Sequence, residues 1–318
     1  SKSPDMSLSA PLPRRKLDRA PHAFLKIADG CSRKCSFCAI PRIKGPRRSV
    51  PKEILLEEAR GLLRRGVREI NIIAQDVAGY GRDLYPDYSL CDLLEDILAF
   101  SGKYWLRLLY LYPSDLNQRL LEIMMADRRL CPYLDIPLQH LSPGILRSMK
   151  RPADALSVLD KLSRWRKILP DLAIRSTFIV GFPGESKGDF RLLLEESARF
   201  RFDRLGAFLY SPEEGTRAFV LPGRIPVRTA RRRLDRLMTR QAAIALKINT
   251  ARVGGVMDVL VEDFFPEEGI YVGRTCRDAP DVDGVVLFSS PWPHNAGSIV
   301  PVRITGAKPY DLIGEAIK

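Results

Sequence analysis

Three cysteines within eight residues, Cys31, Cys35 and Cys38, constrain this chain more than any other feature of its sequence. They follow a short apolar segment and precede a basic loop that contains proline. Intervals of three and then two residues let the sulfur atoms converge on one face of a metal or a cluster without a regular helix or strand. The pattern therefore predicts that these three cysteines are metal ligands.

A fourth ligand is missing nearby. A structural zinc site needs a closed tetrahedron of cysteine or histidine. The nearest candidates have no paired spacing that would complete one: His22, Cys91, Cys131 and His140. Iron–sulfur cubanes are normally held by four thiolates, so three thiolates leave one iron open to an exogenous ligand. The sequence therefore favours a catalytic cluster at the three cysteines; structural zinc and incidental buried thiols are the alternatives.

At 318 residues the chain is long enough for one large domain or two unequal ones. Cys91, Cys131 and Cys276 are scattered and form no disulfide framework. No apolar run approaches the ~20 residues of a membrane span, and no signal-peptide-like apolar segment opens the chain. We therefore expect a cytoplasmic protein without membrane association.

The net charge of +13 is unevenly distributed. Residues 254–318 carry five basic and ten acidic side chains, a net charge of −5, which leaves +18 on the rest of the chain. Basic surfaces attract nucleic acids, because Lys and Arg release counterions when they neutralise phosphates. The two parts should therefore prefer different partners.

Strand-like and helix-like segments alternate six times between residues 22 and 252. The strands are mostly apolar, as expected when both faces of a parallel sheet are covered. Expected strands are 24–28, 70–74, 105–112, 133–136, 173–180 and 204–210. Expected helices are 51–65, 88–100, 114–127, 142–150, 153–168 and 187–201. This predicts an α/β domain built as an open sheet or a barrel, and periodicity does not decide between the two.

The two ends of the chain differ from this domain. Residues 1–21 contain four prolines and no apolar period, which predicts a flexible lead or linker. A basic helix is expected at about 228–252, with a solvated face or a nucleic-acid or ribosomal contact as its two interpretations. From residue 253, short alternating segments at 256–261, 269–274, 285–288 and 299–305 indicate a small antiparallel β-barrel. The expected domains are therefore 1–21, 22–252 and 253–318.

The pattern Cys-x3-Cys-x2-Cys, with the aromatic Phe37 before its third cysteine, resembles the signature of radical S-adenosylmethionine enzymes. The resemblance implies a 4Fe-4S cluster on the three cysteines, with S-adenosylmethionine chelating the fourth iron and Phe37 beside the cofactor. It also implies a partial (β/α)6 TIM-like barrel, with active-site residues at the strand ends. The phrase GSIVPVRITGAKPYDLIGEA resembles a TRAM domain, an OB-like module found behind methylthiotransferase barrels.

Motifs at the expected strand ends imply further cofactor contacts. Gln75 and Asp76, in INIIAQD, are assigned to the methionyl amino group, which needs hydrogen-bond acceptors; ordinary polar strand ends are the alternative. Gln139, in DIPLQH, is assigned to the ribose because an amide both donates and accepts. His140 stays open between a structural and a catalytic role.

The fifth and sixth strands supply the remaining candidates. Arg175, in IRSTFIVGFPGE, is assigned to the methionyl carboxylate, since a guanidinium fork pairs with carboxylates. Gly181 is assigned to a tight turn that approaches the adenosyl group, because glycine has no Cβ. Tyr210 is assigned to adenine.

Together, AQDVAGYG, IPLQH and RSTFIVGFPGE resemble methylthiotransferases of the RimO type more than those of the tRNA-modifying MiaB type. The RimO type adds a methylthio group to the β-carbon of an aspartate in small-subunit ribosomal protein twelve, by radical chemistry that needs an external electron donor. A basic ribosomal protein should be attracted to the acidic TRAM module. The alternatives are a tRNA methylthiotransferase of the MiaB type, with contacts to tRNA or ribosomal RNA, and a non-enzymatic zinc and RNA-binding protein.

Full-length members of this family carry an N-terminal domain with three more cysteines and a second 4Fe-4S cluster, where sulfur is assembled. Cys91, Cys131 and Cys276 are too scattered to replace that site. The resemblance therefore leads us to expect a truncated form that binds one cluster and cleaves S-adenosylmethionine but does not complete methylthiolation.

Overall fold

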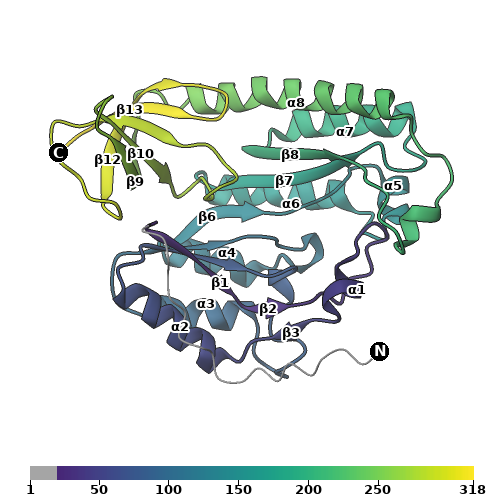
Figure 1. Cartoon of the computed structure of the whole chain (residues 1–318), viewed down its shortest axis with the longest axis horizontal. Helices are drawn as coiled ribbons and strands as arrows, with labels where there is room; N and C mark the ends of the chain where they lie inside the picture. Colours follow the sequence, from purple (N-terminus) through teal and green to yellow (C-terminus); the bar gives the residue numbers. More distant parts are fainter. Residues whose placement is uncertain (1–19) are drawn as a thin grey trace.

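The computed structural model describes residues 20–318, so the predicted lead over residues 1–21 lies almost wholly outside the described residues. Six parallel strands form an open sheet in the order β1-β4-β5-β6-β7-β8 (Figure 1). They are β1 (His22–Lys26), β4 (Glu69–Ile73), β5 (Trp105–Leu108), β6 (Leu130–Asp135), β7 (Ala173–Val180) and β8 (Arg204–Leu209). The predicted partial (β/α)6 barrel is confirmed.

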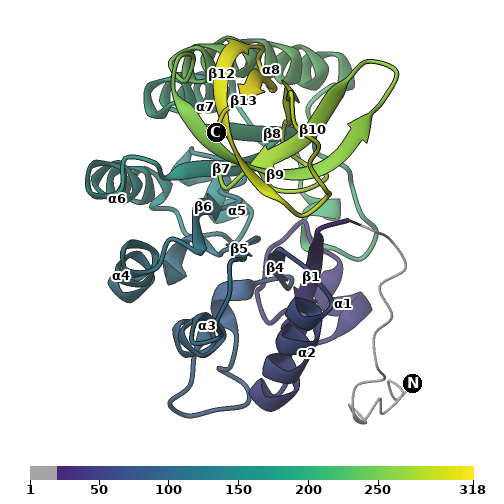
Figure 2. The same cartoon turned by 90° about the vertical axis from the view of Figure 1, so that its left-hand side faces the viewer.

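Helices cover the outer face of this curved sheet (Figure 2). The longer ones are α2 (Lys52–Arg64), α3 (Leu90–Leu98), α4 (Gln118–Ala126), α6 (Ala155–Ile168) and α7 (Lys187–Phe200). Strand β7 shows how the pleat divides the side chains: Ile174 and Phe178 are fully buried in the main apolar core, whereas Arg175 and Thr177 on the opposite face are only half-buried. That second face lines the inside of the barrel, where polar residues collect.

Two predicted elements end differently in the structure. The strand expected at 105–112 stops at Leu108, because Tyr110 adopts a left-handed φ of 61° that strand geometry does not allow. The helix expected at 114–127 begins only at Gln118, where the Asn117 side chain accepts a hydrogen bond of 2.9 Å from the amide of Leu120. A 3-10 turn at Pro113–Asp115 precedes it.

Short elements follow the first strand and were not predicted. They are β2 (Ala28–Asp29), α1 (Ile40–Lys44) and β3 (Arg48–Ser49). Strands β2 and β3 pair with each other and bracket the cysteine loop, which places that loop at the carboxyl ends of the parallel strands (Figure 1). The later helix α5 (Pro143–Ser148) lies at the same end.

The C-terminal domain is a closed five-stranded barrel in the order β10-β11-β13-β12-β9. Its strands are β9 (Val256–Phe265), β10 (Ile270–Thr275), β11 (Val286–Ser289), β12 (Ile299–Ala307) and β13 (Leu312–Ala316). The last strand was not predicted, and it pairs parallel to β11, so the barrel is not wholly antiparallel. Val259, Phe288 and Val302 form the centre of its apolar core.

Helix α8 (Val227–Thr250) joins the two domains and packs along β8 and α7 (Figure 1). Its buried polar side chains form hydrogen bonds with both domains. The Gln241 side-chain amide donates to the carbonyl of Phe202 at 2.9 Å, and the Asn249 side-chain amide donates to the carbonyl of Lys308 at 3.0 Å. No helix among residues 20–318 is both long and apolar enough to cross a bilayer.

The C-terminal barrel covers the amino ends of the parallel strands, opposite the cysteine loop (Figure 1). Arg107, fully buried on β5, donates to Glu69 at 2.6 Å and to the carbonyl of Cys276 at 2.8 Å. Arg274, from the C-terminal barrel, donates to the other oxygen of Glu69 at 2.5 Å. One carboxylate of the sheet therefore pairs with an arginine from each domain, and Glu262 gives Arg274 a second carboxylate partner at 2.6 Å.

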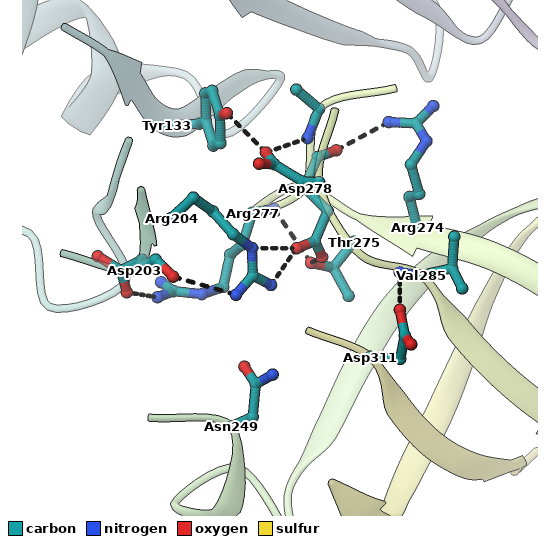
Figure 3. A network of polar contacts seen from close by, with 12 residues as sticks. Tyr133, Asp203, Arg204, Asn249, Arg274, Thr275, Arg277, Asp278, Val285 and Asp311 are labelled. Atoms are coloured by element: carbon teal, nitrogen blue, oxygen red, sulfur yellow. Dashed lines mark hydrogen bonds and ion pairs between the residues drawn. The ribbon is translucent and has the colours of Figure 1, made fainter. Parts of the chain in front are cut away.

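A second group of buried polar contacts lies beside it (Figure 3). Arg204 of β8 pairs with Asp278, and Arg277 donates to Asp203 at 2.6 Å. The Tyr133 hydroxyl donates to Asp283 at 2.6 Å. Buried charges are tolerated when they are paired and hydrogen-bonded, so this network can hold the two domains together. We call this closed end of the (β/α)6 barrel, where the C-terminal barrel covers the amino ends of the strands, its floor.

Candidate active site

The cysteine loop opens into a cavity of about 370 Å³ at the carboxyl ends of the strands. All three cysteines line it, together with Phe37, Gln75 and Gln139. Its other walls come from the loops after β4, β5 and β6 and from Arg33, Ile40 and Arg151. The structure therefore brings together six of the residues that the sequence singled out.

Backbone contacts hold the cysteine loop in place, and none of its three thiols forms a disulfide. Gly30 has φ 70°, and a Cβ there would lie 2.2 Å from the carbonyl oxygen of Pro46, so only glycine fits the turn before Cys31. The amide of Cys31 donates to Gly45 at 3.1 Å, and the amide of Ser36 donates to Met149 at 2.9 Å. These bonds pin the loop to neighbouring segments on both sides.

Burial raises the pKa of the Cys31 and Cys38 thiols, and the negative charge of a Cys35 thiolate raises both further. This mutual effect reflects three thiols that face one space. No three His, Cys, Asp or Glu side chains in the described part of the chain converge tightly enough to hold a single metal ion. The three thiols line one cavity, as a multi-iron cluster with one open position requires.

Gln75 and Gln139 approach the cavity from β4 and β6. The Gln75 Oε1 atom is buried and has no hydrogen-bond partner among residues 20–318, although buried polar atoms are normally paired. Gln139 has a left-handed φ of 72°, fixed because its amide donates to Thr177 at 2.8 Å and its carbonyl accepts from Ile179 at 2.8 Å. Both side chains are placed to bind a ligand, and the contacts assigned to them stay predictions.

Asp76 acts on the cavity through two arginines. Its carboxylate, almost fully buried, accepts from Arg33 Nε at 2.7 Å and from Arg47. Arg33 also pairs with Asp115 and reaches the cavity wall. Asp76 holds both arginines through Oδ2, whereas its Oδ1 is buried and has no partner among residues 20–318; the predicted contact with an amino group stays a prediction.

Phe37 and Tyr210 share a small apolar cluster beside the cavity. Both pack around Phe182, and the rings of Phe182 and Tyr210 meet edge to face with centroids 5.1 Å apart. The Tyr210 hydroxyl has no partner among the described residues. A flat aromatic ligand would find an apolar wall here, in line with the expected adenine contact.

Arg175 and Gly181 lie elsewhere. Arg175 donates to Asp135 at 3.0 Å, and its Nε lies 3.5 Å from Asp283 of the C-terminal barrel, so its guanidinium points to the floor and not into the cavity. The expected role at the methionyl carboxylate does not fit this position. The position of a residue along a strand pattern does not tell how deep in the barrel its side chain lies.

Gly181 is accounted for by packing against α8. Its φ is 77°, its amide donates to the Glu185 carboxylate, and a Cβ would lie 2.6 Å from that of Ala230. His140 is fully buried, with its Nδ1 accepting from the amide of Ser142 at 2.9 Å. Burial lowers the pKa of His140 to about 4, and its Nε2 has no hydrogen-bond partner among residues 20–318, so both interpretations of this residue stay open.

Sequence reasoning missed eight residues of the cavity wall, and four of them are arginines or tyrosines: Arg33, Tyr110, Tyr112 and Arg151. Arg33 lies inside the cysteine motif, so its position was a usable signal. Arg151 follows a short helix in a segment with no periodicity of its own, and only the fold brings it to Cys35.

Known proteins match this chain over nearly its whole length. The radical SAM superfamily matches residues 25–196, and the TRAM domain family matches residues 253–317. The ribosomal protein uS12 methylthiotransferase RimO of Moorella thermoacetica is 44% identical over 313 residues, which are 98% of this chain and 71% of that protein. The protein of the same name from Citrifermentans bemidjiense is 43% identical over 95% of this chain and 68% of its own length.

The fold also resembles a solved structure. The radical S-adenosylmethionine methyltransferase TsrM of Kitasatospora setae superposes with a TM-score of 0.51 at 16% identity, over 64% of this chain and 38% of that one. A likeness at that identity concerns the barrel alone.

Proposed function

Since this chain belongs to the RimO family of radical S-adenosylmethionine methylthiotransferases, we propose that it adds a methylthio group to ribosomal protein uS12, at the β-carbon of an aspartate. The observation that carries the proposal is the convergence of Cys31, Cys35 and Cys38 on one cavity within this family's barrel. The cofactors of such an enzyme are a 4Fe-4S cluster and S-adenosylmethionine. The chain spans about 70% of the length of these relatives.

The residues present suit these cofactors. Three free thiols supply the ligands of a cluster with one open iron. When bound, the cluster and S-adenosylmethionine supply an organic radical that removes hydrogen from an unreactive carbon. Gln75 offers an unpaired buried oxygen to an ammonium group, Gln139 offers an amide to the ribose, and Phe37 with Tyr210 offers an apolar wall to adenine.

The charge of the C-terminal barrel supports a basic protein as substrate. Six of its acidic side chains are exposed, and three of its basic ones: Asp258, Asp263, Glu267, Glu268, Asp281, Glu315, Arg303, Lys308 and Lys318. Complementary charge speeds association and orients a partner more than it adds affinity. We therefore assign this surface to the approach of the ribosomal protein.

Helix α8 supports a second candidate, modification of a tRNA. Its arginines at 231, 232, 236 and 240 are exposed, whereas Arg233 is buried in an ion pair with Glu185 at 3.0 Å. Exposed arginines on a helix contact phosphates or simply solvate the surface. The distribution of modified products decides between the two substrates.

The test compares cells that contain the gene for this protein with cells that lack it. In the cells that lack the gene, mass spectrometry should show that uS12 is lighter by one methylthio group. Methylthio-modified tRNA nucleosides should persist in these cells. Restoring the wild-type gene should restore the uS12 mass, and a Cys35→Ala gene should not. Unmodified tRNA with unchanged uS12 would overturn the proposal in favour of the tRNA enzyme.

A further inference from the structure

Arg151 is the one residue of the cavity wall whose guanidinium reaches a cysteine sulfur in the described structure. Its Nη1 donates to Cys35 Sγ at 3.8 Å, and its Nη2 donates to the carbonyl of Pro137. The Nε is buried and has no hydrogen-bond partner within residues 20–318. The side chain therefore presents donors to the thiol that would bind one iron.

Aromatic stacking fixes this orientation. The Arg151 guanidinium lies over the ring of Tyr112, 4.3 Å from its centroid. The Arg33 guanidinium lies over the same ring, 3.7 Å from the centroid. Cation–π contacts of this kind favour a guanidinium that lies over the face of the ring. Two arginines and one tyrosine thus form a stack beside the cysteine loop.

The two arginines of the stack differ in their charge partners. Arg33 is paired with Asp76 and Asp115, so two carboxylates oppose its charge. Arg151 forms no ion pair with any residue in the described part of the chain. A half-buried cation without a carboxylate is costly unless an anion reaches it from outside the chain.

Charge and hydrogen bonding at a thiolate affect a bound cluster in a known direction. Reduction by one electron makes a thiolate-bound 4Fe-4S cluster more negative, and donors to its sulfurs together with nearby positive charge stabilise that form. The reduction potential then rises. A cluster of this family must accept an electron from an external donor before it acts.

We propose that Arg151 is a positioning residue that raises the reduction potential of the cluster by donating to the thiolate of Cys35 and by leaving its positive charge uncompensated. Tyr112 serves this role by holding the guanidinium in place. The inference rests on the part of the proposed function that puts a 4Fe-4S cluster on the three cysteines, and it is independent of whether uS12 or a tRNA is modified.

The test measures the reduction potential of the anaerobically loaded protein, without S-adenosylmethionine, from the electron paramagnetic resonance signal of the reduced cluster at a series of fixed potentials. Arg151→Gln removes the charge, and we expect the ratio of reduced to oxidised cluster at a given potential to fall about tenfold, equivalent to about 59 mV for one electron. Arg151→Lys keeps the charge but not the fork that reaches both Pro137 and Cys35, so its shift should be smaller. Tyr112→Leu should also lower the potential.

Arg147→Gln is the matched control, because Arg147 is an exposed arginine in the last turn of α5 with no contact to the cavity. Its potential should equal that of the wild type. Iron content is measured for each variant, so that potentials are compared only between loaded proteins.

Wild-type potentials in both Arg151→Gln and Arg151→Lys, at full iron content, would overturn the inference. An equal shift in Arg147→Gln would overturn it too, since the effect would then come from net charge alone. If the wild-type protein itself takes up no iron, the proposed cofactor fails, which is a different result from a loaded cluster with an unchanged potential.

Discussion

Both ends of the (β/α)6 barrel contain buried polar and charged side chains, but these are paired at one end and partly unpaired at the other. At the floor, Arg107 and Arg274 share the buried Glu69, and Arg204 pairs with Asp278, so each buried cation has its carboxylate. At the carboxyl end, Gln75 Oε1 and Arg151 Nε are buried and have no partner among residues 20–318. The charged side chains of the floor are paired within the described chain, whereas Gln75 and Arg151 at the other end keep unpaired atoms.

This difference separates stability from function. A satisfied buried network contributes to folding only as a whole, because removal of one member leaves a buried charge uncompensated. Unpaired polar atoms in a cavity contribute little to folding, but they bind a ligand that supplies the missing partners. Changes at the floor should therefore alter unfolding, and changes at the cavity should alter ligand binding.

The largest expected effect is the loss of the cluster in Cys35→Ala. The variant should bind almost no 4Fe-4S cluster after anaerobic loading, because two thiolates cannot replace three. Its free energy of unfolding without cofactor should stay within about 1 kcal/mol of the wild type. Iron analysis and denaturant unfolding measure the two quantities, and Cys91→Ala, outside the cavity, serves as the iron control. A wild-type iron content in Cys35→Ala would contradict the assignment of the cavity to ligand binding.

Next in size is the destabilisation caused by Glu69→Ala, which leaves Arg107 and Arg274 buried without their shared carboxylate. We expect a loss of about 3–5 kcal/mol in the free energy of unfolding. Glu57→Ala is the control, because Glu57 pairs with Arg64 where both side chains are about 65% exposed, and its loss should stay below about 1 kcal/mol. Equal losses in the two variants would mean that the floor network is no different from a surface pair.

A smaller effect is expected from acid. Burial alone would raise the pKa of Glu69, but the charges of Arg107 and Arg274 hold it below its ordinary value of 4.5. The stabilisation is therefore fully present above pH 4.5 and is lost as the pH falls through the lowered pKa of the folded state. The difference in unfolding free energy between wild type and Glu69→Gln should shrink over that range, as measured by denaturant unfolding at several pH values. A difference that stays constant or grows would contradict the assignment.

The smallest effect concerns Gln75→Leu, which removes an unpaired oxygen from the cavity. Affinity of the cluster-loaded protein for S-adenosylmethionine should fall about tenfold, the value of one hydrogen bond to a charged group. Stability should not decrease, since the lost oxygen had no partner in the described chain. Calorimetric titration checks the affinity, and a stability loss without an affinity loss would place Gln75 with the structural residues.

The sequence predicted the parts of the site that depend on local spacing. Cys31, Cys35, Cys38 and Phe37 lie on one short loop, and Gln75 and Gln139 each follow a strand whose end could be read from its apolar residues. Parallel strands bring such ends to one edge of the sheet, which is why the local patterns were sufficient.

Depth within the barrel and contacts between distant segments could not be predicted in this way. Arg175 was assigned to the cofactor, but in the structure its guanidinium pairs with Asp135 and Asp283 outside the cavity wall, and Asp283 is more than a hundred residues away in the sequence. Arg151 was missed for the same reason, since its neighbour Cys35 is 116 residues distant. The sequence analysis treated all the acidic residues of 254–318 as surface charge. In the structure, Glu262, Asp278 and Asp283 instead pair with buried side chains.

The floor of the barrel has a consequence for the order in which the chain is made. Arg107 and its partner Cys276 are 169 residues apart, and a ribosome adds about 5–20 residues per second. The strands therefore wait roughly ten to thirty seconds, at that rate, for the segment that neutralises and covers their lower ends. During that interval the cysteine loop has already left the ribosome while the opposite end of the barrel is still wet. The larger barrel therefore gains its floor only after its cysteine loop has emerged from the ribosome.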